Sequence, residues 1–278
     1  MQKTIEEVEI FYDGLDHPEC VAIHTDGSVW AGGEAGQIYK ISPDGKQCEL
    51  IANTGGFVLG IAFSPDHQWL AICDLKKKCI WKLDLRTASL TCLFTHIQGR
   101  AINIPNYPVF DSEGNLYVSD SGAFRQVNGC IYKIKSTGAA TIWHEGPFNF
   151  PNGMCLSHDK KYLYVACTWL PGVEAVAITE DGSAGERKIL IEIKETCPDG
   201  ICTGSDGDLY ISCYSPNTIY RLNKSGALST FIHDWEAHTI CNPTNMAVSP
   251  DGNYMYVANL GRWHIARIQL TSIQNNQK

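Results

Sequence analysis

The feature that most constrains this 278-residue chain is a pattern that occurs six times along it. Each unit has an apolar strand pattern, a tight turn rich in Asp, Gly and Pro, and a second strand pattern. The acidic turn residues are Asp26, Asp66, Glu113, Asp159, Asp206 and Asp251. They are separated by 40, 47, 46, 47 and 45 residues. A period of about 40–50 residues built from short strands is typical of β-propeller blades.

Further strand patterns follow each hairpin. A third strand is predicted in every unit, at 37–41, 79–83, 130–134, 173–178, 218–222 and 264–270. A fourth is predicted in the first five units, at 48–51, 90–94, 140–143, 188–193 and 228–232. The sixth unit has no fourth strand, but a spare strand pattern at 7–12 precedes the first unit.

These counts predict an all-β fold, a six-bladed β-propeller with four-stranded blades that forms a single domain over residues 1–278. The N-terminal strand would complete the last blade and close the ring. A β-sandwich also has short strands, but it does not predict so regular a register. Helical patterning is nearly absent, which excludes folds built from βαβ units.

The composition narrows the class of partner. A net charge of −8 argues against nucleic acid or an anionic membrane, because both attract basic surfaces. We expect a small-molecule partner and a monomer or small homo-oligomer. Residues 1–11 lack the features of a signal peptide, and no apolar run is long enough to span a bilayer. The 12 cysteines form no Cys-x-x-Cys pair, so reduced core thiols in a cytoplasmic protein are expected.

One position of the repeat, seven residues before the turn acid, gathers oxygen-bearing side chains. The first strand of each propeller blade lines the central channel, so residues at this position converge on the axis at one face. The six residues are Glu19, Leu59, Asn106, Asn152, Asp199 and Thr244. Four of these six are carboxylates or amides, which predicts a ring of oxygen ligands.

Two carboxylates and two amide carbonyls, without His or Cys, suit a hard divalent cation. Ca²⁺ is the first choice, followed by Mg²⁺ or Mn²⁺, and Zn²⁺ can occupy some all-oxygen sites. An Asn or Asp before Gly is also an ordinary turn residue, so each residue alone is explained by a turn. Their shared register favours a metal, because two buried carboxylates without a cation are costly unless one stays protonated.

The connections between second and third strands open on the same face and are expected to wall a substrate pocket. Their candidate residues are Asp120, Arg125, Trp169, Tyr214, Arg262 and Trp263. The tryptophans can stack on a substrate ring, and an arginine can hold an anionic group. Exposed loop aromatics also serve blade packing. The nine histidines show no metal-ligand spacing, and we assign none of them a catalytic role.

The chain resembles the senescence-marker-protein/gluconolactonase family of six-bladed, metal-dependent lactonases, which is related to squid-type diisopropylfluorophosphatase. The resemblance covers all six units. Its motifs are HPEC from His17, NIPNYPVFDSEGNLYVSD from Asn103, FPNGMCLSHD from Phe150, CPDGICTGSDG from Cys197 and PTNMAVSPDG from Pro243. The chain departs from the family where it has Glu19-Cys20-Val21 instead of Glu-Gly-Pro. It also has Pro105-Asn106-Tyr107 where Pro-Asn-Asp is common.

The resemblance implies roles for several residues. The family's metal ligands correspond to Glu19, Asn106, Asn152 and Asp199 here, and its favoured base or nucleophile corresponds to Asp199. A substrate contact is implied for Asn103, and Asn106 is expected to help it orient the substrate's ring oxygens.

The leading hypothesis is hydrolysis of a sugar lactone or related cyclic ester. The cation would polarise the carbonyl, and Asp199 would act as base or nucleophile. Alternatives are hydrolysis of phosphotriesters or aryl esters at the same metal, a non-enzymatic propeller that binds a ligand or protein around a structural cation, and a non-hydrolytic reaction on the same fold.

Overall fold

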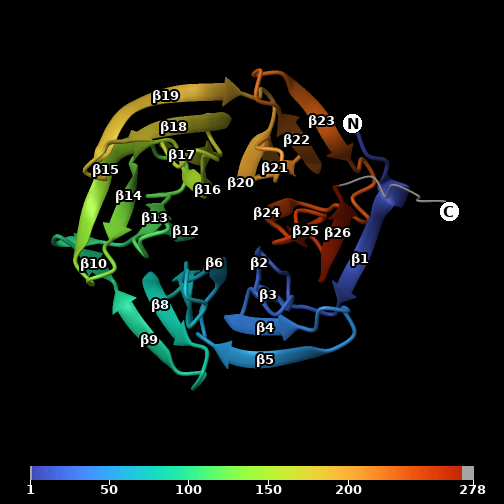
Figure 1. Ribbon diagram of the computed structural model, residues 1–278, viewed down its shortest axis with the longest axis horizontal. Helices are drawn as coiled ribbons and strands as arrows, with labels where there is room; N and C mark the ends of the chain where they lie inside the picture. The colour runs from blue at the N-terminus through green and yellow to red at the C-terminus, as the bar shows by residue number, and fades with distance from the viewer. Residues whose placement is uncertain (1, 271–278) are drawn as a thin grey trace.

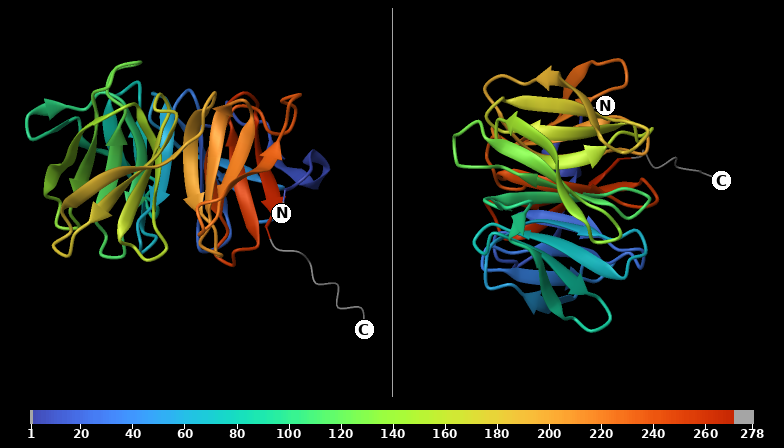
Figure 2. Two further views of the ribbon diagram at one scale, coloured as in Figure 1. Left: turned by 90° about the horizontal axis from the view of Figure 1, so that it is seen from above. Right: turned by 90° about the vertical axis from the view of Figure 1, so that its left-hand side faces the viewer.

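The computed structural model describes residues 2–270, so the predicted domain of 1–278 extends beyond the described residues at both ends. Apart from a short 3₁₀ turn, η1 (Ile5–Glu7), the regular elements of this part are strands. Six four-stranded antiparallel sheets surround a central axis (Figure 1), and Figure 2 shows the ring from two further sides. The predicted six-bladed propeller is confirmed.

The blades follow one another along the chain. Blade 1 contains β2 (Cys20–Ile23), β3 (Val29–Gly32), β4 (Gln37–Ile41) and β5 (Cys48–Asn53). Blade 2 contains β6 (Val58–Phe63), β7 (Trp69–Asp74), β8 (Cys79–Asp84) and β9 (Leu90–Phe94). Blade 3 contains β12 (Pro105–Phe110), β13 (Leu116–Asp120), β14 (Gly129–Ile134) and β15 (Ala140–Phe148).

Blade 4 contains β16 (Pro151–Leu156), β17 (Tyr162–Cys167), β18 (Gly172–Ile178) and β19 (Ala184–Glu192). Blade 5 contains β20 (Cys197–Thr203), β21 (Leu209–Ser215), β22 (Thr218–Leu222) and β23 (Leu228–His233). Blade 6 contains β24 (Pro243–Val248), β25 (Tyr254–Asn259), β26 (His264–Gln269) and β1 (Val8–Asp13). A small hairpin that the repeat did not predict, β10 (His96–Ile97) with β11 (Arg100–Ala101), lies between blades 2 and 3 in sequence.

The ring closes between the two ends of the chain. Strand β1 pairs antiparallel with β26, with Val8 opposite Ile268 and Asp13 opposite His264 (Figure 1). The last blade is therefore completed by the first strand, as predicted. This pairing puts Glu19, near the start of the chain, beside blade 6, where its carbonyl oxygen accepts a hydrogen bond from Thr244 Oγ1 at 2.6 Å.

The hydrophobic core is divided among the six contacts between neighbouring blades. Each of six buried clusters draws its residues from two adjacent blades; Val21 and Ala258, for example, join blades 1 and 6. Burial of apolar side chains contributes roughly 25 cal/mol per Å² of area removed from water. The blades are thus held side by side, and the inner strands stay at fixed positions around the axis.

The cysteines differ from expectation at one place. Cys79 of β8 and Cys92 of β9 form a disulfide within blade 2, so the prediction that all cysteines are reduced is wrong for this pair. The two strands pair with Trp81 opposite Cys92, so Cys79, two residues before Trp81, lies on the same face of the sheet as Cys92. The sequence does not reveal this register. The other ten cysteines are free, and seven of them are buried.

Within residues 2–270, no helical segment has the length and apolar character needed to cross a bilayer.

Candidate metal centre

The predicted ring residues lie where the inner strands are irregular. In five blades the register of the first strand is broken at this point, between Val58 and Gly60, Pro105 and Pro108, Pro151 and Met154, Pro198 and Ile201, and Pro243 and Met246. A β-bulge re-aims a side chain that a regular ladder would direct along the sheet face. The repeated Pro followed by Asn, Asp or Thr therefore coincides with a β-bulge in the first strand. Preferences of these residues for tight turns do not explain it.

Glycine follows the ring residue in three blades, as Gly60, Gly153 and Gly200, because the inner strands almost touch. A Cβ atom added to Gly153 would lie 2.6 Å from the carbonyl oxygen of Asp199 and 2.7 Å from Cα of Gly200. Only a residue without a side chain lets β16 and β20 approach this closely. The Asn152-Gly153 and Asp199-Gly200 pairs thus serve strand packing, and they do not form the free-standing turns that dipeptides of this kind often make.

The four predicted ligands are all buried and share one further property. Glu19, Asn106, Asn152 and Asp199 are at most 7% exposed. Within residues 2–270, nine buried side-chain polar atoms have no hydrogen-bond partner, and four of these belong to the ring. They are Glu19 Oε2, Asn106 Oδ1, Asn152 Oδ1 and Asp199 Oδ1. Buried acceptors without partners are rare in folded proteins, because each loses its hydration without replacement.

Hydrogen bonds from the side-chain amide nitrogens explain why the amide oxygens of the two asparagines are the atoms without partners. Asn106 Nδ2 donates a hydrogen bond to Ser121 Oγ at 3.0 Å, and Asn152 Nδ2 donates to Asp199 Oδ2 at 3.0 Å. Each amide is therefore held by its nitrogen, and its carbonyl oxygen lacks a partner. Two carboxylate and two carbonyl oxygens form the ligand set that hard divalent cations prefer.

Electrostatics point the same way. Burial raises the pKa of Glu19 well above its usual range, and the negative charges of Asp199 and Glu34 raise it further. Burial also raises the pKa of Asp199, to about 7, although the hydrogen bond from Asn152 opposes the rise. Two carboxylates at one buried site repel each other, and a bound cation would remove that repulsion. The residues present therefore fit a divalent cation.

Two blades contribute no free oxygen at the ring position. Leu59 is apolar and 6% exposed, and the Thr244 hydroxyl is already used as a donor to the Glu19 carbonyl. The next residue in blade 6, Asn245, was not selected from the sequence. Its Nδ2 donates to the carbonyl oxygens of Glu19 and Leu59, at 3.0 and 3.1 Å, and its Oδ1 is a further buried oxygen without a partner.

Hydroxyl groups on the second strands hold the ring strands in place, and the sequence analysis missed them. Ser119 Oγ donates to the Asn152 carbonyl at 2.8 Å, and Ser121 Oγ donates to the Pro151 carbonyl at 2.7 Å. Thr168 Oγ1 donates to the Pro198 carbonyl at 2.8 Å. Each of these bonds joins one blade to the next, just behind a ring residue. In blades 3 and 4, a Ser or Thr at or just after the end of the second strand was the signal available in the sequence.

Asp120 supports the site without facing it. This carboxylate is 1% exposed and accepts hydrogen bonds from the backbone N–H groups of Asn103, Ile104 and Gly122, at 2.9, 2.9 and 3.0 Å, and from the Tyr132 hydroxyl at 3.0 Å. Both oxygens are committed, so Asp120 fixes the chain that leads into β12. We therefore propose a supporting role for Asp120 instead of the predicted substrate contact.

The predicted arginine and tryptophan of blades 3 and 4 lie together. The Arg125 guanidinium stands 5.6 Å from the Phe124 ring and 5.5 Å from the Trp169 ring, and the two rings meet edge to face at 5.6 Å. Phe124, which the sequence analysis did not select, is 64% exposed. Burial raises the pKa of the Cys197 thiol, and the charge of Asp199 raises it further. The positive charge of Arg125 opposes this rise, so Arg125 acts on a residue two positions before Asp199 in the chain.

The predicted residues of blades 5 and 6 lie on the same face. Burial raises the pKa of Tyr214, and the charges of Glu19 and Asp199 raise it further. Trp263 is 50% exposed, and its ring lies 5.5 Å from the imidazole of His17. Arg262, in contrast, donates two hydrogen bonds to the Ala237 carbonyl, at 3.1 and 3.0 Å.

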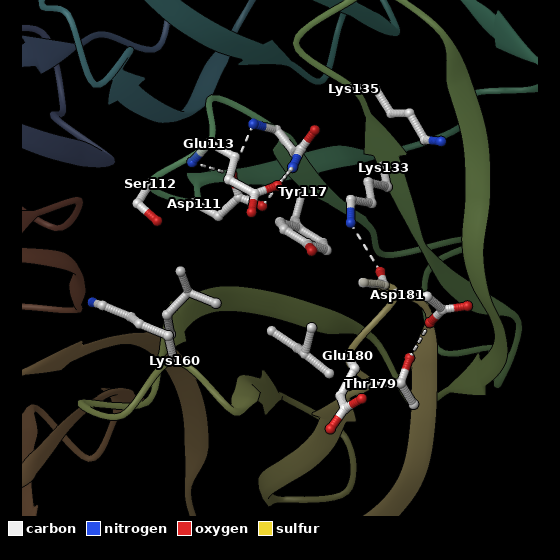
Figure 3. A pocket seen from close by; sticks show the side chains of 14 residues that line it. Asp111, Ser112, Glu113, Tyr117, Lys133, Lys135, Lys160, Thr179, Glu180 and Asp181 are labelled. Carbon is white, nitrogen blue, oxygen red and sulfur yellow. Dashed lines mark hydrogen bonds between the residues drawn. The ribbon is translucent and has the colours of Figure 1, made fainter.

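Two other features of the described chain do not belong to this centre. Ligand atoms of Asp16, His17 and Glu34 lie within 4.8 Å of one another, but Asp16 already accepts hydrogen bonds from Ala35 N and Gln37 Nε2. A cavity of about 370 Å³ lies at the hairpin turns of blades 3 and 4 (Figure 3). None of the predicted site residues lines it, and its polar groups bond to one another, such as Lys133 Nζ to the Gly182 carbonyl at 2.8 Å.

The fold and site together define a six-bladed β-propeller with a buried set of unpartnered oxygen atoms contributed by four of its blades. The model of the SMP-30/Gluconolactonase/LRE-like region family matches residues 83–261, and the chain belongs to this family.

Individual relatives agree with this assignment. Over 125 residues the chain is 28% identical to a protein named lactonase drp35 from Staphylococcus saprophyticus. The match covers 43% of this chain and 39% of that protein, so less than half of the relative's length is represented.

Two solved structures share the fold. A gluconolactonase from Xanthomonas campestris superposes with a TM-score of 0.82 at 18% identity, covering 95% of this chain and 89% of that one. The calcium-binding protein regucalcin from Agrobacterium tumefaciens superposes with a TM-score of 0.75 at 15% identity, covering 96% and 95%. At these identities the likeness concerns the fold alone.

Proposed function

We propose that this protein is a divalent-metal-dependent hydrolase that opens a sugar lactone or a related cyclic ester. The observation that carries the proposal is the set of four buried, unpartnered oxygens at one position of the repeat. Membership of a family named for gluconolactonase, and the lactonase names of relatives, support the choice of reaction.

Glu19, Asn106, Asn152 and Asp199 are the residues that would hold the cation. Ca²⁺ is the first choice because all four donors are oxygens, and a protein of the same fold is named as calcium-binding. Mg²⁺, Mn²⁺ and Zn²⁺ are the alternatives. A bound divalent cation supplies Lewis-acid polarisation of a carbonyl oxygen.

Asp199 is the residue that we assign as the reacting carboxylate. It is buried in the ring with Oδ1 unpartnered, while Oδ2 is fixed by Asn152. As a base, Asp199 takes a proton from the water that attacks the lactone carbonyl carbon. As a nucleophile, it attacks that carbon itself and forms a mixed anhydride, which water then hydrolyses to release the hydroxy acid and regenerate the Asp199 carboxylate. In both cases the ring C–O bond breaks, and the alkoxide that leaves takes up a proton.

Asn103 would orient the substrate. Its Nδ2 donates to the Gly122 carbonyl at 2.6 Å, and its Oδ1 accepts from Lys78 Nζ at 2.9 Å. A primary amide has a second N–H and a second lone pair, so each end can form one more hydrogen bond. The amide is held in one orientation by the protein and can still bind a sugar hydroxyl or ring oxygen.

The test combines elemental analysis with a substrate panel. Purified protein, dialysed against metal-free buffer, is reloaded with Ca²⁺, Mg²⁺, Mn²⁺ or Zn²⁺ and assayed against aldonolactones and paraoxon-like aryl esters, with a no-enzyme control for spontaneous lactone opening. The proposal expects one bound cation per chain and lactone hydrolysis that chelation abolishes. Hydrolysis of the aryl esters alone would favour the phosphotriesterase or arylesterase alternative. Bound metal without hydrolysis of any substrate would favour a binding scaffold.

A further inference from the structure

A run of basic residues stands on the ring face of a protein that is acidic overall. Lys76, Lys77 and Lys78 form the connection between the second and third strands of blade 2, and all three are exposed. The chain has a net charge of −8, yet none of the ion pairs found within residues 2–270 involves these lysines. Blade 2 is also the blade that contributes Leu59, and so no oxygen, to the ring.

The lysine connection has a defined conformation. Asp74 Oδ1 accepts hydrogen bonds from the backbone N–H groups of Phe57 and Lys77, at 3.0 and 2.9 Å. Lys78 has a left-handed backbone with φ of 51°, a conformation that non-glycine residues adopt at some cost. Its ammonium donates to Asn103 Oδ1 at 2.9 Å. The connection therefore aims Lys78 at the residue proposed to contact substrate.

The connection that contains Arg125 contacts the other end of the Asn103 amide. Asn103 Nδ2 bonds to the Gly122 carbonyl, and Gly122 lies in the same connection as Arg125. The guanidinium rests against Phe124 and Trp169, and no hydrogen-bond acceptor or carboxylate of the described chain lies within bonding distance of it. Arg262, the other arginine of these connections considered above, has its donors occupied by Ala237. Arg125 thus keeps its fork of N–H groups free for a ligand.

We infer that the site is built for a lactone that carries a fixed anionic group, a phosphate or a carboxylate, which Lys78 and Arg125 bind from either side of Asn103. This inference rests on the proposed lactone hydrolysis. A guanidinium pairs well with either anion, and a lysine ammonium adds a point charge. Lys76 and Lys77 extend the positive potential toward solvent and would draw the anionic substrate toward the mouth.

Blade 1, which adjoins blade 2, carries the opposite charge at its own connections. Ligand atoms of Asp16 and Glu34 lie within 4.8 Å of each other there. An anionic substituent is therefore repelled at blade 1 and attracted at the connections of blades 2 and 3. This asymmetry gives the substrate one favoured orientation over the ring.

The kinetic test compares three substrates: glucono-1,5-lactone, its 6-phosphate, and an aldaric acid monolactone with a free carboxylate. The wild type is expected to favour one of the two anionic lactones over the neutral one by at least about tenfold in kcat/KM. Lys78→Gln and Arg125→Gln should each reduce that preference about tenfold, mainly through KM. Lys46→Gln, which removes a lysine charge 80% exposed at the hairpin turn of β4 and β5, should leave the preference unchanged.

The two anionic substrates separate the two possible sources of charge. Preference for the 6-phosphate identifies a phosphorylated lactone, and preference for the monolactone identifies a carboxylated one. A preference for the neutral lactone, or an anionic preference that neither variant reduces, would overturn the inference and leave the lactonase proposal in place.

A binding measurement makes the inference independent of turnover. Calcium-loaded protein is titrated calorimetrically with glucose, glucose 6-phosphate and glucuronate. At least one anionic sugar should bind about tenfold or more tightly than glucose, with an affinity that decreases as salt is added and is lost in Lys78→Gln and Arg125→Gln. Such binding without hydrolysis of any lactone would refute the proposed function but retain the anion site. Equal binding of all three sugars would refute the anion site.

Discussion

Asn152 of blade 4 donates a hydrogen bond from Nδ2 to Oδ2 of Asp199 in blade 5, at 3.0 Å. The same nitrogen lies 3.3 Å from Thr168 Oγ1. Because the amide is held by its nitrogen and the carboxylate by Oδ2, the remaining oxygen of each side chain is buried without a partner. A single contact between two blades therefore sets the orientation of two of the four proposed ligands.

Asp199→Asn should reduce kcat for lactone opening by about 10²- to 10⁴-fold, because it removes the proposed base or nucleophile and one ligand charge. The propeller should stay folded, since the side chain is nearly isosteric, and this is checked by circular dichroism and thermal unfolding. Asp159→Asn, in a hairpin turn on the opposite face, serves as the matched control. Wild-type turnover by Asp199→Asn would remove Asp199 from the mechanism.

Glu19→Gln should weaken Ca²⁺ binding by about tenfold or more, because it removes one of the two carboxylate ligands. It should also raise the melting temperature of the metal-free protein, since the buried repulsion between Glu19 and Asp199 disappears. In the wild type, Ca²⁺ at about 100 times its Kd should stabilise the fold by about 2.7 kcal/mol.

Calorimetric titration and thermal unfolding with and without chelator measure both effects. An unchanged Ca²⁺ affinity in Glu19→Gln would show that the cation lies elsewhere.

Gly153→Ala should destabilise the fold by about 1–3 kcal/mol and lower metal affinity, because the added Cβ would lie 2.6 Å from the Asp199 carbonyl oxygen. The strands β16 and β20 would have to separate, and this moves Asn152 away from Asp199. Gly185→Ala, in the outer strand β19, is the control, since its Cβ would meet its nearest neighbour at 3.2 Å. Urea unfolding and calcium titration measure the outcome, and equal effects of the two substitutions would contradict the packing argument.

Asp234→Asn should lower stability at pH 7 by about 1–3 kcal/mol. Burial opposes ionisation of Asp234, but backbone N–H groups including those of Thr239 and Ile240, at 2.8 and 2.9 Å, outweigh it and hold its pKa below the usual value. A depressed folded-state pKa contributes stability that is present above the unfolded value of about 3.9 and is lost as the pH falls through the folded value.

The difference between wild type and Asp234→Asn should therefore be largest near pH 7 and shrink below about pH 4. Urea unfolding at pH 7, 4 and 3 measures it. Asp44→Asn, at a turn carboxylate that is 58% exposed, is the control. A difference that stays constant across this range would mean that the charge of Asp234 has no role.

Much of the fold could be predicted because a propeller repeats its local chemistry. Strands β4, β9 and β22 have the predicted bounds, and the spare N-terminal strand pairs with β26 as expected. The ring position followed from the same repeat, since one register position in six blades must converge on one axis. The burial of Glu19, Asn106, Asn152 and Asp199 agrees with this, while metal binding itself stays a prediction.

Other features depend on contacts that have no fixed spacing in the sequence. Arg125 and Arg262 were equivalent candidates for binding an anion. Only the fold shows that Arg262 donates hydrogen bonds to the Ala237 carbonyl, whereas Arg125 has no hydrogen-bond acceptor among the described residues. Asp120 was selected for its place in a loop, but its oxygens bond to the backbone N–H groups of Asn103 and Ile104, 17 and 16 residues away. The Cys79–Cys92 bond depends on the pairing register of β8 and β9, which no sequence pattern marks.

By itself, then, the sequence determined the number of blades, the closure of the ring and the register position shared by Glu19, Asn106, Asn152 and Asp199, because each follows from counting along a repeat. The tertiary structure decided which atoms of those residues are free. Asn152 and Asp199 are 47 residues apart in the chain, and only their packing shows that one hydrogen bond uses a nitrogen and an oxygen and leaves two oxygens unpaired. Whether a polar atom is available depends on its neighbours in space, and a repeat fixes residue positions without fixing those neighbours.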